Sequence, residues 1–445
     1  TSGGDDTFHT LSGAPTPSVS TAAGSNSVVF DYGTYDTPTN QASVIDLLFT
    51  VTASNDPYAD ALKLANRAVV TANNTALVPE NNEGIAEITS SEPELQITKG
   101  IVATDNAAGI FSPATVGPAS FNAPGTLGSR FTGTISSTNL ASTPIDSDLS
   151  DVDHADLVTY VIVVENQGSG KFGAFDTIIK DSPAAGMAIP GFGVDGINLR
   201  VTDGAGTPLP FTRVGTGLFD PAGGIELTDP SATQGAIARG VDSSGSVVTD
   251  GSNIVVISYD MRVLQNTVLA KLTNTGAVTQ YAATEGGPDF TGSGSLTDPA
   301  VITIATDNLL HKELVTTEIV DAVNALNEAV IGELVTYRIT LTVPEATMPS
   351  ARIVDSLDNQ NRLGFVEMVG VTASPSITLS GSTTPTISDN GRRITFDLGD
   401  IANSDTYNSV TETITLEYRA VVLNVQAAQG GSRVRNTARL TFDGL

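Results

Sequence analysis

The chain has 445 residues, no cysteine, no tryptophan and a formal net charge of −28. Without cysteine there is no disulfide, so covalent reinforcement needs another chemistry. The negative charge disfavours nucleic acid and anionic membrane surfaces as partners. No stretch approaches the roughly 18 consecutive apolar residues of a membrane span, so we expect no membrane insertion in this segment.

The composition favours an all-β fold. Thr, Ser, Gly, Val and Ile are abundant, hydrophobic residues make up 40% and aromatic residues only 5%. Many short strands joined by Gly, Pro, Asn and Asp turns give this profile. At about 100–200 residues per domain the length predicts two to four domains. The internal repeats indicate three.

Three similar strands mark the ends of the repeats. In chain order they place an asparagine at Asn66, Asn274 and Asn436, each within an apolar or β-branched segment. Another apolar strand precedes each of them at a similar distance, with a tyrosine in the second and third cases, Tyr259 and Tyr418. Even spacing of this kind predicts one supersecondary unit used three times.

The second and third repeats also begin alike. Each opens with a lysine-bearing strand, continues with a Leu-Val-Thr-Tyr strand at 157–160 or 334–337, and then reaches an Asp-Ser pair. We therefore predict a partial repeat at 1–92, the C-terminal half of a unit, and complete repeats at 93–307 and 308–445. The second repeat is longer because a Gly/Pro/Ser/Thr-rich insertion at about 105–150 is expected to form a surface loop.

The first repeat lacks both the lysine strand and the Leu-Val-Thr-Tyr strand. One explanation is that the segment belongs to a longer tandem array. The other is that a neighbouring subunit donates the missing strands to an open sheet edge. Both make neighbouring copies or further repeats of the same protein the expected partners.

Alternation along the strands predicts which polar side chains face the cores, because every second residue of a strand lies on the same face. By this parity each complete repeat points one Lys, one Asp and one Asn inward. The residues are Lys99, Asp181 and Asn274 in the second repeat and Lys312, Asp355 and Asn436 in the third.

Three interpretations of these inward-facing residues stay open. Buried polar groups must satisfy one another, so the three side chains form either a covalent Lys–Asn amide or an unlinked hydrogen-bonded triad. Alternatively, the lysines reach the rim of the domain while Asn and Asp cap turns. In the covalent case burial favours a neutral amine and a protonated acid. The amine attacks the Asn side-chain carbon, ammonia leaves, and Asp181 or Asp355 transfers the protons.

The third repeat resembles the isopeptide-forming domain of Gram-positive fimbrial subunits and the related surface repeat of many exported bacterial and archaeal proteins. The resemblance runs from Lys312 through the Leu-Val-Thr-Tyr strand, Asp355 and Tyr418 to Asn436. The second repeat matches the same pattern more loosely. The resemblance implies tandem immunoglobulin-like β-sandwiches in an elongated extracellular array, with cross-links Lys99–Asn274 and Lys312–Asn436.

An acidic segment is a candidate calcium site, because hard cations take oxygen ligands and alternating Asp residues in a loop suit them. Its carboxylates are Asp146, Asp148, Asp151, Asp153 and Asp156. The segment lacks the Gly turn and terminal Glu of an EF-hand loop. A solvated acidic loop is the alternative, and calcium is the one cofactor that the sequence suggests.

The sequence therefore predicts a non-enzymatic structural protein of the cell surface, such as a stalk, a fimbrial subunit or an adhesin spacer. A second hypothesis is an adhesin that binds a ligand or a surface glycan through 105–150 or 200–250. A third is a carbohydrate hydrolase, which needs only two carboxylates. Nine tyrosines without tryptophan supply few sugar platforms, and no Gly-x-Ser-x-Gly motif is present.

Overall fold

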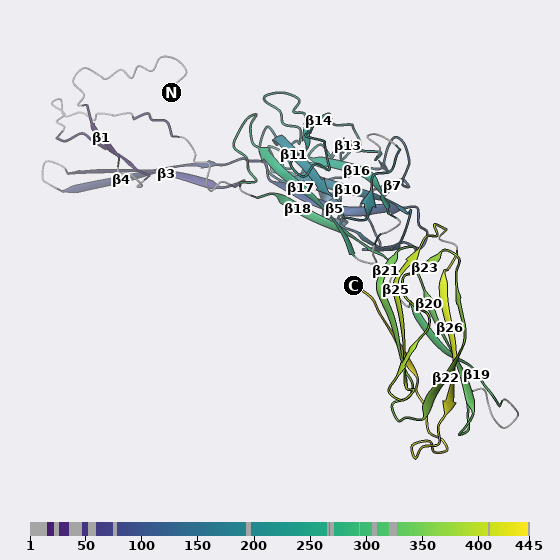
Figure 1. The fold of residues 1–445 in the computed structure, drawn as a ribbon. Coiled ribbons are helices and arrows are strands. Elements are labelled where there is room, and N and C mark those ends of the chain that lie inside the picture. The colour runs from purple at the N-terminus through teal and green to yellow at the C-terminus, as the bar shows by residue number, and fades with distance from the viewer. Residues whose placement is uncertain are drawn as a thin grey trace. The chain divides into compact units, whose positions relative to one another are not determined.

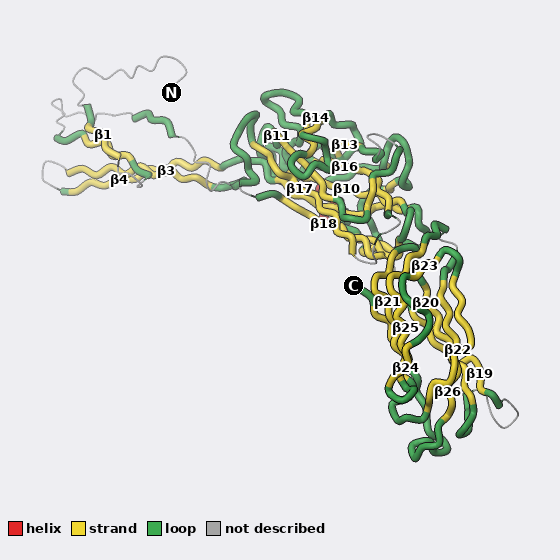
Figure 2. Tube along the Cα trace, in the orientation of Figure 1, coloured by secondary structure: helices red, strands yellow, loops and turns green. Residues whose placement is uncertain are grey.

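The computed structural model describes residues 16–21, 26–34, 47–51, 59–73, 78–192, 197–264, 267, 271–292, 294–304, 309–319, 327–407 and 410–443. Contacts divide the chain into two units, Thr1–Tyr58 and Ala59–Leu445. Regular structure in the described residues is almost entirely β, as Figures 1 and 2 show, with one short helix, α1 (Ser137–Ser142). No helix among these residues is long and apolar enough to cross a membrane. The all-β class expected from the composition is confirmed.

The described part of the first unit contains one strand pair. Strand β1 (Ser18–Thr21) runs antiparallel to β2 (Val28–Asp31). The second unit begins with a long antiparallel ribbon of β3 (Lys63–Asn73) and β4 (Pro79–Thr89). Asn66 lies in β3 and is exposed. Among the described residues β3 and β4 pair only with each other, and the half-repeat at 1–92 stays a prediction.

The second repeat is a sandwich of two sheets. The first sheet has the order β12-β16-β10-β5, with β13 also on β16, and the second has the order β14-β15-β11-β17-β18-β9-β6. The first sheet comprises β5 (Leu95–Thr104), β10 (Leu157–Asn166), β12 (Met187–Ala188), β13 (Arg200–Asp203) and β16 (Ile254–Val263). The second comprises β6 (Ile110–Ser112), β9 (Asp148–Val152), β11 (Phe175–Ser182), β14 (Phe211–Val214), β15 (Gly224–Leu227), β17 (Lys271–Ala282) and β18 (Leu296–Ile304).

The insertion at 105–150 builds a second small core instead of an exposed loop. It contains β7 (Ser120–Phe121), β8 (Phe131–Thr132) and α1. Its buried apolar residues cover the outer face of β10 and β16, where the sheet would otherwise meet water. The members of this core are Val102, Phe131, Ile135, Leu140, Ile145, Val161, Val163, Ile254 and Val256. Burial on both faces explains why β10 and β16 are nearly continuous apolar runs rather than alternating ones.

The third repeat is a second sandwich. One sheet has the order β19-β20-β26-β22, and the other has the order β23-β25-β21-β27, with β24 also on β25. The strands are β19 (Leu310–Thr317), β20 (Leu334–Thr342), β21 (Thr347–Ser356), β22 (Leu363–Ala373), β23 (Ile377–Leu379), β24 (Thr386–Ser388), β25 (Arg393–Asn403), β26 (Thr413–Val422) and β27 (Thr437–Thr441). Burial alternates along β26, as expected for a strand with one face on the core.

Candidate functional site

The core of the second repeat contains a buried polar cluster, contributed by strands of both sheets. The Lys99 ammonium on β5 donates hydrogen bonds to Asp181 on β11 and, at 3.0 Å, to the Tyr259 hydroxyl on β16. That hydroxyl donates to the other Asp181 oxygen. The Asn274 amide on β17 donates to the same hydroxyl at 3.0 Å. All four residues are at most 1% exposed, so the parity prediction is confirmed here.

The third repeat holds the same cluster. The Lys312 ammonium donates to Asp355 and, at 3.1 Å, to the Tyr418 hydroxyl. Tyr418 donates to Asp355 at 2.6 Å, and the Asn436 amide donates to Tyr418 at 2.7 Å. Two sandwiches of the chain thus contain the same Lys–Asp–Tyr–Asn arrangement. The lysines do not lie at the rim of the domain, and Asp and Asn do not cap turns.

Tyrosine is the participant that the sequence reasoning missed. Tyr259 and Tyr418 served there only as strand markers, yet each hydroxyl joins the other three side chains. Each also pairs directly across the sheet with the tyrosine of the Leu-Val-Thr-Tyr strand, Tyr160 or Tyr337, with ring centroids 5.7 Å apart. Two tyrosines at matching places in both repeats were the available signal.

The second tyrosine of each pair lines the lysine side chain. The Lys99 nitrogen lies 5.1 Å from the Tyr160 ring centroid, and the Lys312 nitrogen lies 5.2 Å from that of Tyr337. The lysine strand is hydrogen-bonded to the tyrosine strand in both repeats, so the register brings the amine over the ring. Aromatic faces attract a cationic amine and exclude water from a neutral one.

Burial sets the protonation of the cluster. It lowers the pKa of Lys99 and of Lys312 to about 8, and the neighbouring aspartate opposes this shift without cancelling it. Burial also raises the pKa of Asp355, against the effect of Lys312. The pKa values of Tyr259 and Tyr418 are raised by burial and then by the nearby aspartate, so both hydroxyls remain protonated donors at neutral pH.

The acceptor side of each amide is unsatisfied. The Oδ1 atoms of Asn274 and Asn436 are buried and have no hydrogen-bond partner among the described residues. A buried acceptor without a partner costs free energy of about 1–3 kcal/mol. This carbonyl is the group that an isopeptide reaction attacks, and its free oxygen is available to a proton from the acid.

The arrangement therefore brings a nucleophile, an acid and an electrophile together in a dry core. The Lys99 and Asn274 nitrogens both hydrogen-bond one hydroxyl, Tyr259, so each lies 3.0 Å from the same oxygen atom. A lysine with a lowered pKa reaches its neutral, nucleophilic form more readily. The protonated partner carboxyl is then an acid for the leaving group.

The five aspartates of the acidic segment do not gather into one group. Residues 148–152 form strand β9 rather than a loop, and a strand sends alternate side chains to opposite faces. Asp148 accepts the backbone N–H of Val301, and Asp156 accepts the side-chain amide of Asn106. Calcium binding by the whole set of Asp146, Asp148, Asp151, Asp153 and Asp156 has no structural support.

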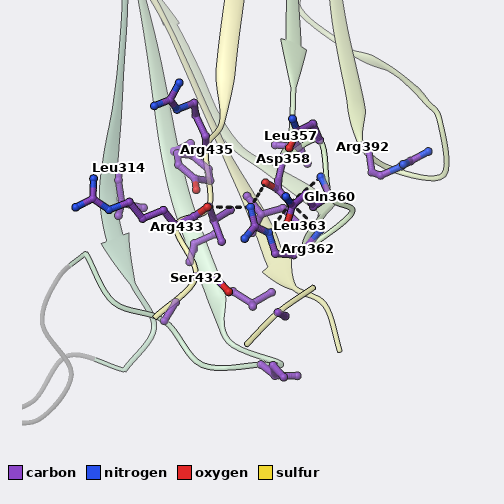
Figure 3. A pocket seen from close by; sticks show the side chains of 18 of the residues that line it. Leu314, Leu357, Asp358, Gln360, Arg362, Leu363, Arg392, Ser432, Arg433 and Arg435 are labelled. Carbon is purple, nitrogen blue, oxygen red and sulfur yellow. Dashed lines mark hydrogen bonds and ion pairs between the residues drawn. The ribbon is translucent and has the colours of Figure 1, made fainter. Parts of the chain in front are cut away.

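A groove of about 1810 Å³ lies at one end of the third sandwich. Figure 3 shows Arg362 there beside Asp358, and the Arg362 guanidinium also donates to the carbonyl of Arg433 at 2.8 Å. Arg392 and Arg435 line the same groove, as does Tyr337 of the lysine site. An arginine-rich lining contrasts with the acidic composition of the whole chain.

No family model matches the chain, and no curated protein matches it. Solved structures with similar folds include the C-terminal domain of the antigen I/II-family protein AspA of Streptococcus pyogenes, at 17% identity, 79% coverage of this chain, 96% of that chain and TM-score 0.28. The C-terminal domain of BspA of Streptococcus agalactiae is 15% identical, with 66% of this chain and 91% of that chain covered and a TM-score of 0.26. BcpA, the major pilin subunit of Bacillus cereus, is 11% identical, with 74% of this chain and 77% of that chain covered and a TM-score of 0.25. At such low TM-scores these likenesses carry no weight in the functional argument.

Proposed function

We propose that the chain is a non-enzymatic structural protein of a cell surface, a stalk, filament subunit or adhesin spacer, whose complete sandwiches are reinforced by Lys–Asn isopeptide bonds. The supporting observation is the recurrence of one buried Lys–Asp–Tyr–Asn cluster in two sandwiches of a chain without cysteine. A buried charge pair is costly to assemble and gives little net stability. Its presence twice therefore favours a chemical role.

The reaction at the second repeat needs only the chain itself. Asp181 takes a proton from Lys99, and the neutral amine attacks Cγ of Asn274. The bond from Lys99 Nζ to Cγ forms, the bond from Cγ to Nδ2 breaks, and Nδ2 leaves as ammonia with the proton returned by Asp181. As the amide forms, the attacking nitrogen releases its remaining extra proton to the Asp181 carboxylate. The folded core supplies a high effective concentration of the reacting groups.

Such a bond would tie the opening strand of each sandwich, β5 or β19, to a segment near the C-terminal end of that sandwich. In the third repeat it would join β19 to the residue just before β27 and enclose most of the domain. By analogy with disulfides of similar loop length, this would stabilise the domain by roughly 4–5 kcal/mol through chain entropy. Tension along the chain would then pass through a covalent bond and not through strand pairing alone.

Intact-mass spectrometry of the denatured full chain tests the proposal. We expect a mass lower than the plain sequence by two ammonia, reduced to one in Asp181→Ala and in Asp355→Ala. Lys180→Met is the matched control, because Lys180 neighbours Asp181 but its amine contacts the exposed carbonyl of Pro221. It should keep the full deficit. A wild-type mass equal to that of the sequence would leave only an unlinked triad.

The same structure supports self-association by strand addition. Strand β17 is flanked by β11 and β18, whereas β27 pairs only with β21 among the described residues. An open edge of this kind offers unpaired backbone groups to another strand. Cross-linking of the intact protein, with Arg439→Pro in β27 as the blocking variant, tests whether copies associate through this edge.

The second candidate function is ligand binding by an adhesin. The arginine-lined groove of the third sandwich favours an acidic ligand, such as a carboxylated or sulfated glycan. Binding to a glycan array, lost in Arg433→Ala, would support it, whereas a pure spacer should bind none of the glycans.

A further inference from the structure

Three carboxylates from two loops converge at the end of the third sandwich opposite the arginine-lined groove. Glu345 lies between β20 and β21, and Asp405 and Glu412 lie between β25 and β26. Each offers an oxygen within 4.8 Å of the others. Glu345 is 3% exposed and Glu412 is 5% exposed. In the described residues no Lys or Arg forms an ion pair with any of the three.

One of these carboxylates has an unused oxygen. Oε2 of Glu345 is buried and has no hydrogen-bond partner among the described residues. Burial, and then the charges of Asp405, Glu412 and Asp156, raise the pKa of Glu345 to about 7. A buried carboxylate oxygen without a partner beside like charges is unfavourable unless a proton or a cation is bound there.

The protein scaffold holds the two loops in place. Asn403, 1% exposed, donates to the carbonyl of Val343 at 2.9 Å and to Glu412 at 3.4 Å, and its own side-chain oxygen accepts the backbone N–H of Asp405 at 3.1 Å. The backbone N–H of Val343 bonds the carbonyl of Glu412 at 2.9 Å. The carboxylates are therefore positioned without a ligand, as a preorganised site requires.

We propose that Glu345, Asp405 and Glu412 bind one calcium ion. Calcium takes about six to eight oxygen ligands in flexible geometry, which three carboxylates and water supply. Magnesium keeps most of its water and demands near-octahedral geometry, and zinc prefers His or Cys ligands, which this group lacks. The site differs from the acidic segment 146–156, of which Asp153 and Asp156 lie near enough to Glu345 for their charges to act on it.

A second carboxylate group provides a matched control. Asp176, Asp229 and Glu285 also converge within 4.8 Å. Both oxygens of Asp229 are already used, since they accept the backbone N–H groups of Asp176 and Ala236, and one oxygen of Asp176 accepts that of Gly286. This group is more exposed than the first, so water can satisfy its remaining oxygens.

Calcium titration of the chelator-treated full chain by isothermal calorimetry tests the site. We expect one binding event that Glu345→Gln weakens at least tenfold and that Glu285→Gln leaves unchanged. Binding equal in wild type and Glu345→Gln, or no binding up to millimolar calcium, would overturn the proposal.

Thermal melting separates a calcium site from a merely structural carboxylate. Glu345→Gln keeps the shape of the side chain and removes one like charge, so in chelator the variant should melt at or above the wild-type temperature. Added calcium should then raise the wild-type melting temperature by several degrees and the variant by much less. A variant that melts well below wild type in chelator, or a magnesium shift as large as that of calcium, contradicts the proposal.

Discussion

The two lysine sites contain the same four side chains but differ in their enclosure. The Lys99 side chain is fully buried, whereas that of Lys312 is 13% exposed. In the second sandwich β18 pairs with β17, and Asp298 on β18 accepts the backbone N–H of Lys99 at 2.6 Å. In the third sandwich no described strand takes the place of β18, and Tyr337 borders the open groove.

The two sites therefore share their reactive residues and differ in the surrounding residues that exclude water. The reaction depends on four residues, of which the asparagine lies within β17 in one repeat and just before β27 in the other, and both repeats keep all four. The exclusion of water depends on what packs outside these residues, and the repeats differ there. Substitution of one of the four residues should therefore destabilise either sandwich, with the larger loss at the more buried Lys99 site. Substitutions in β18 should destabilise only the second sandwich.

Removal of the acid should have the largest effect. Asp181→Ala leaves the buried Lys99 amine without its acidic partner, and breaking a buried ion pair costs about 3–5 kcal/mol. Asp355→Ala should cost less, because Lys312 is partly exposed to water. Scanning calorimetry of both variants, with separate transitions assigned to the two sandwiches, measures the difference. Equal losses would show that enclosure does not govern the cost.

The pH dependence shows whether the lysines titrate at all. Both have a pKa lowered to about 8 in the folded state from 10.5. Between pH 8 and 10 an unlinked folded chain binds fewer protons than the unfolded chain, so its unfolding free energy rises with pH. The gain is about 2–3 kcal/mol for each lysine. A linked lysine is an amide and gives no gain.

Single variants assign this pH effect to the sites. Lys99→Met and Lys312→Met should each remove half of the increase in an unlinked chain, because the two pKa values are alike. Urea unfolding at pH 8, 9 and 10 measures it. A fall in stability over this range would contradict the lowered lysine pKa values.

Much of the fold and of the lysine sites follows from the sequence because strand parity is a local property. Alternation put Lys99, Asp181 and Asn274 on inward faces without any knowledge of the partner strands. It could not show that Tyr259 joins them, since that requires the register between β10 and β16. The second core built by the insertion could not be predicted either, because a strand that is buried on both faces shows no alternation.

The carboxylate group of the third sandwich could not be predicted from the sequence. Glu345 is 60 or more residues from Asp405 and Glu412 in sequence, and none of the three belongs to an acidic run. The closely spaced aspartates at 146–156 were the calcium candidate from the sequence, although strand β9 sends their side chains to different faces. Sequence density of carboxylates is thus a weaker guide than convergence of loops at the end of a sandwich.

Loss of the tyrosine hydroxyl should have an intermediate effect. Tyr259→Phe removes the acceptor for Lys99 and Asn274, and buried groups without a partner cost about 1–3 kcal/mol. Tyr418→Phe should cost less, because the Lys312 side chain is partly exposed and can bond water instead. Melting temperature and intact mass report stability and bond formation together.

The control for this pair is Tyr160→Phe, since the Tyr160 hydroxyl has no hydrogen-bond partner among the described residues. It should be nearly neutral. A Tyr160→Phe variant as damaged as Tyr259→Phe would mean that ring packing, and not the hydroxyl, is what matters.

The smallest effect is expected from Asp298, which packs beside the lysine site but is not one of its four reactive residues. Asp298→Ala leaves the Lys99 backbone N–H without its side-chain acceptor, at a cost of about 1 kcal/mol. Asp298→Asn retains an oxygen there and should restore most of it. Hydrogen exchange should show faster loss of protection at Lys99 and unchanged protection in β19, the corresponding strand of the third sandwich. Faster exchange in both strands would mean that β18 stabilises more than its own sandwich. It would contradict the expectation that substitutions in β18 affect only the second sandwich.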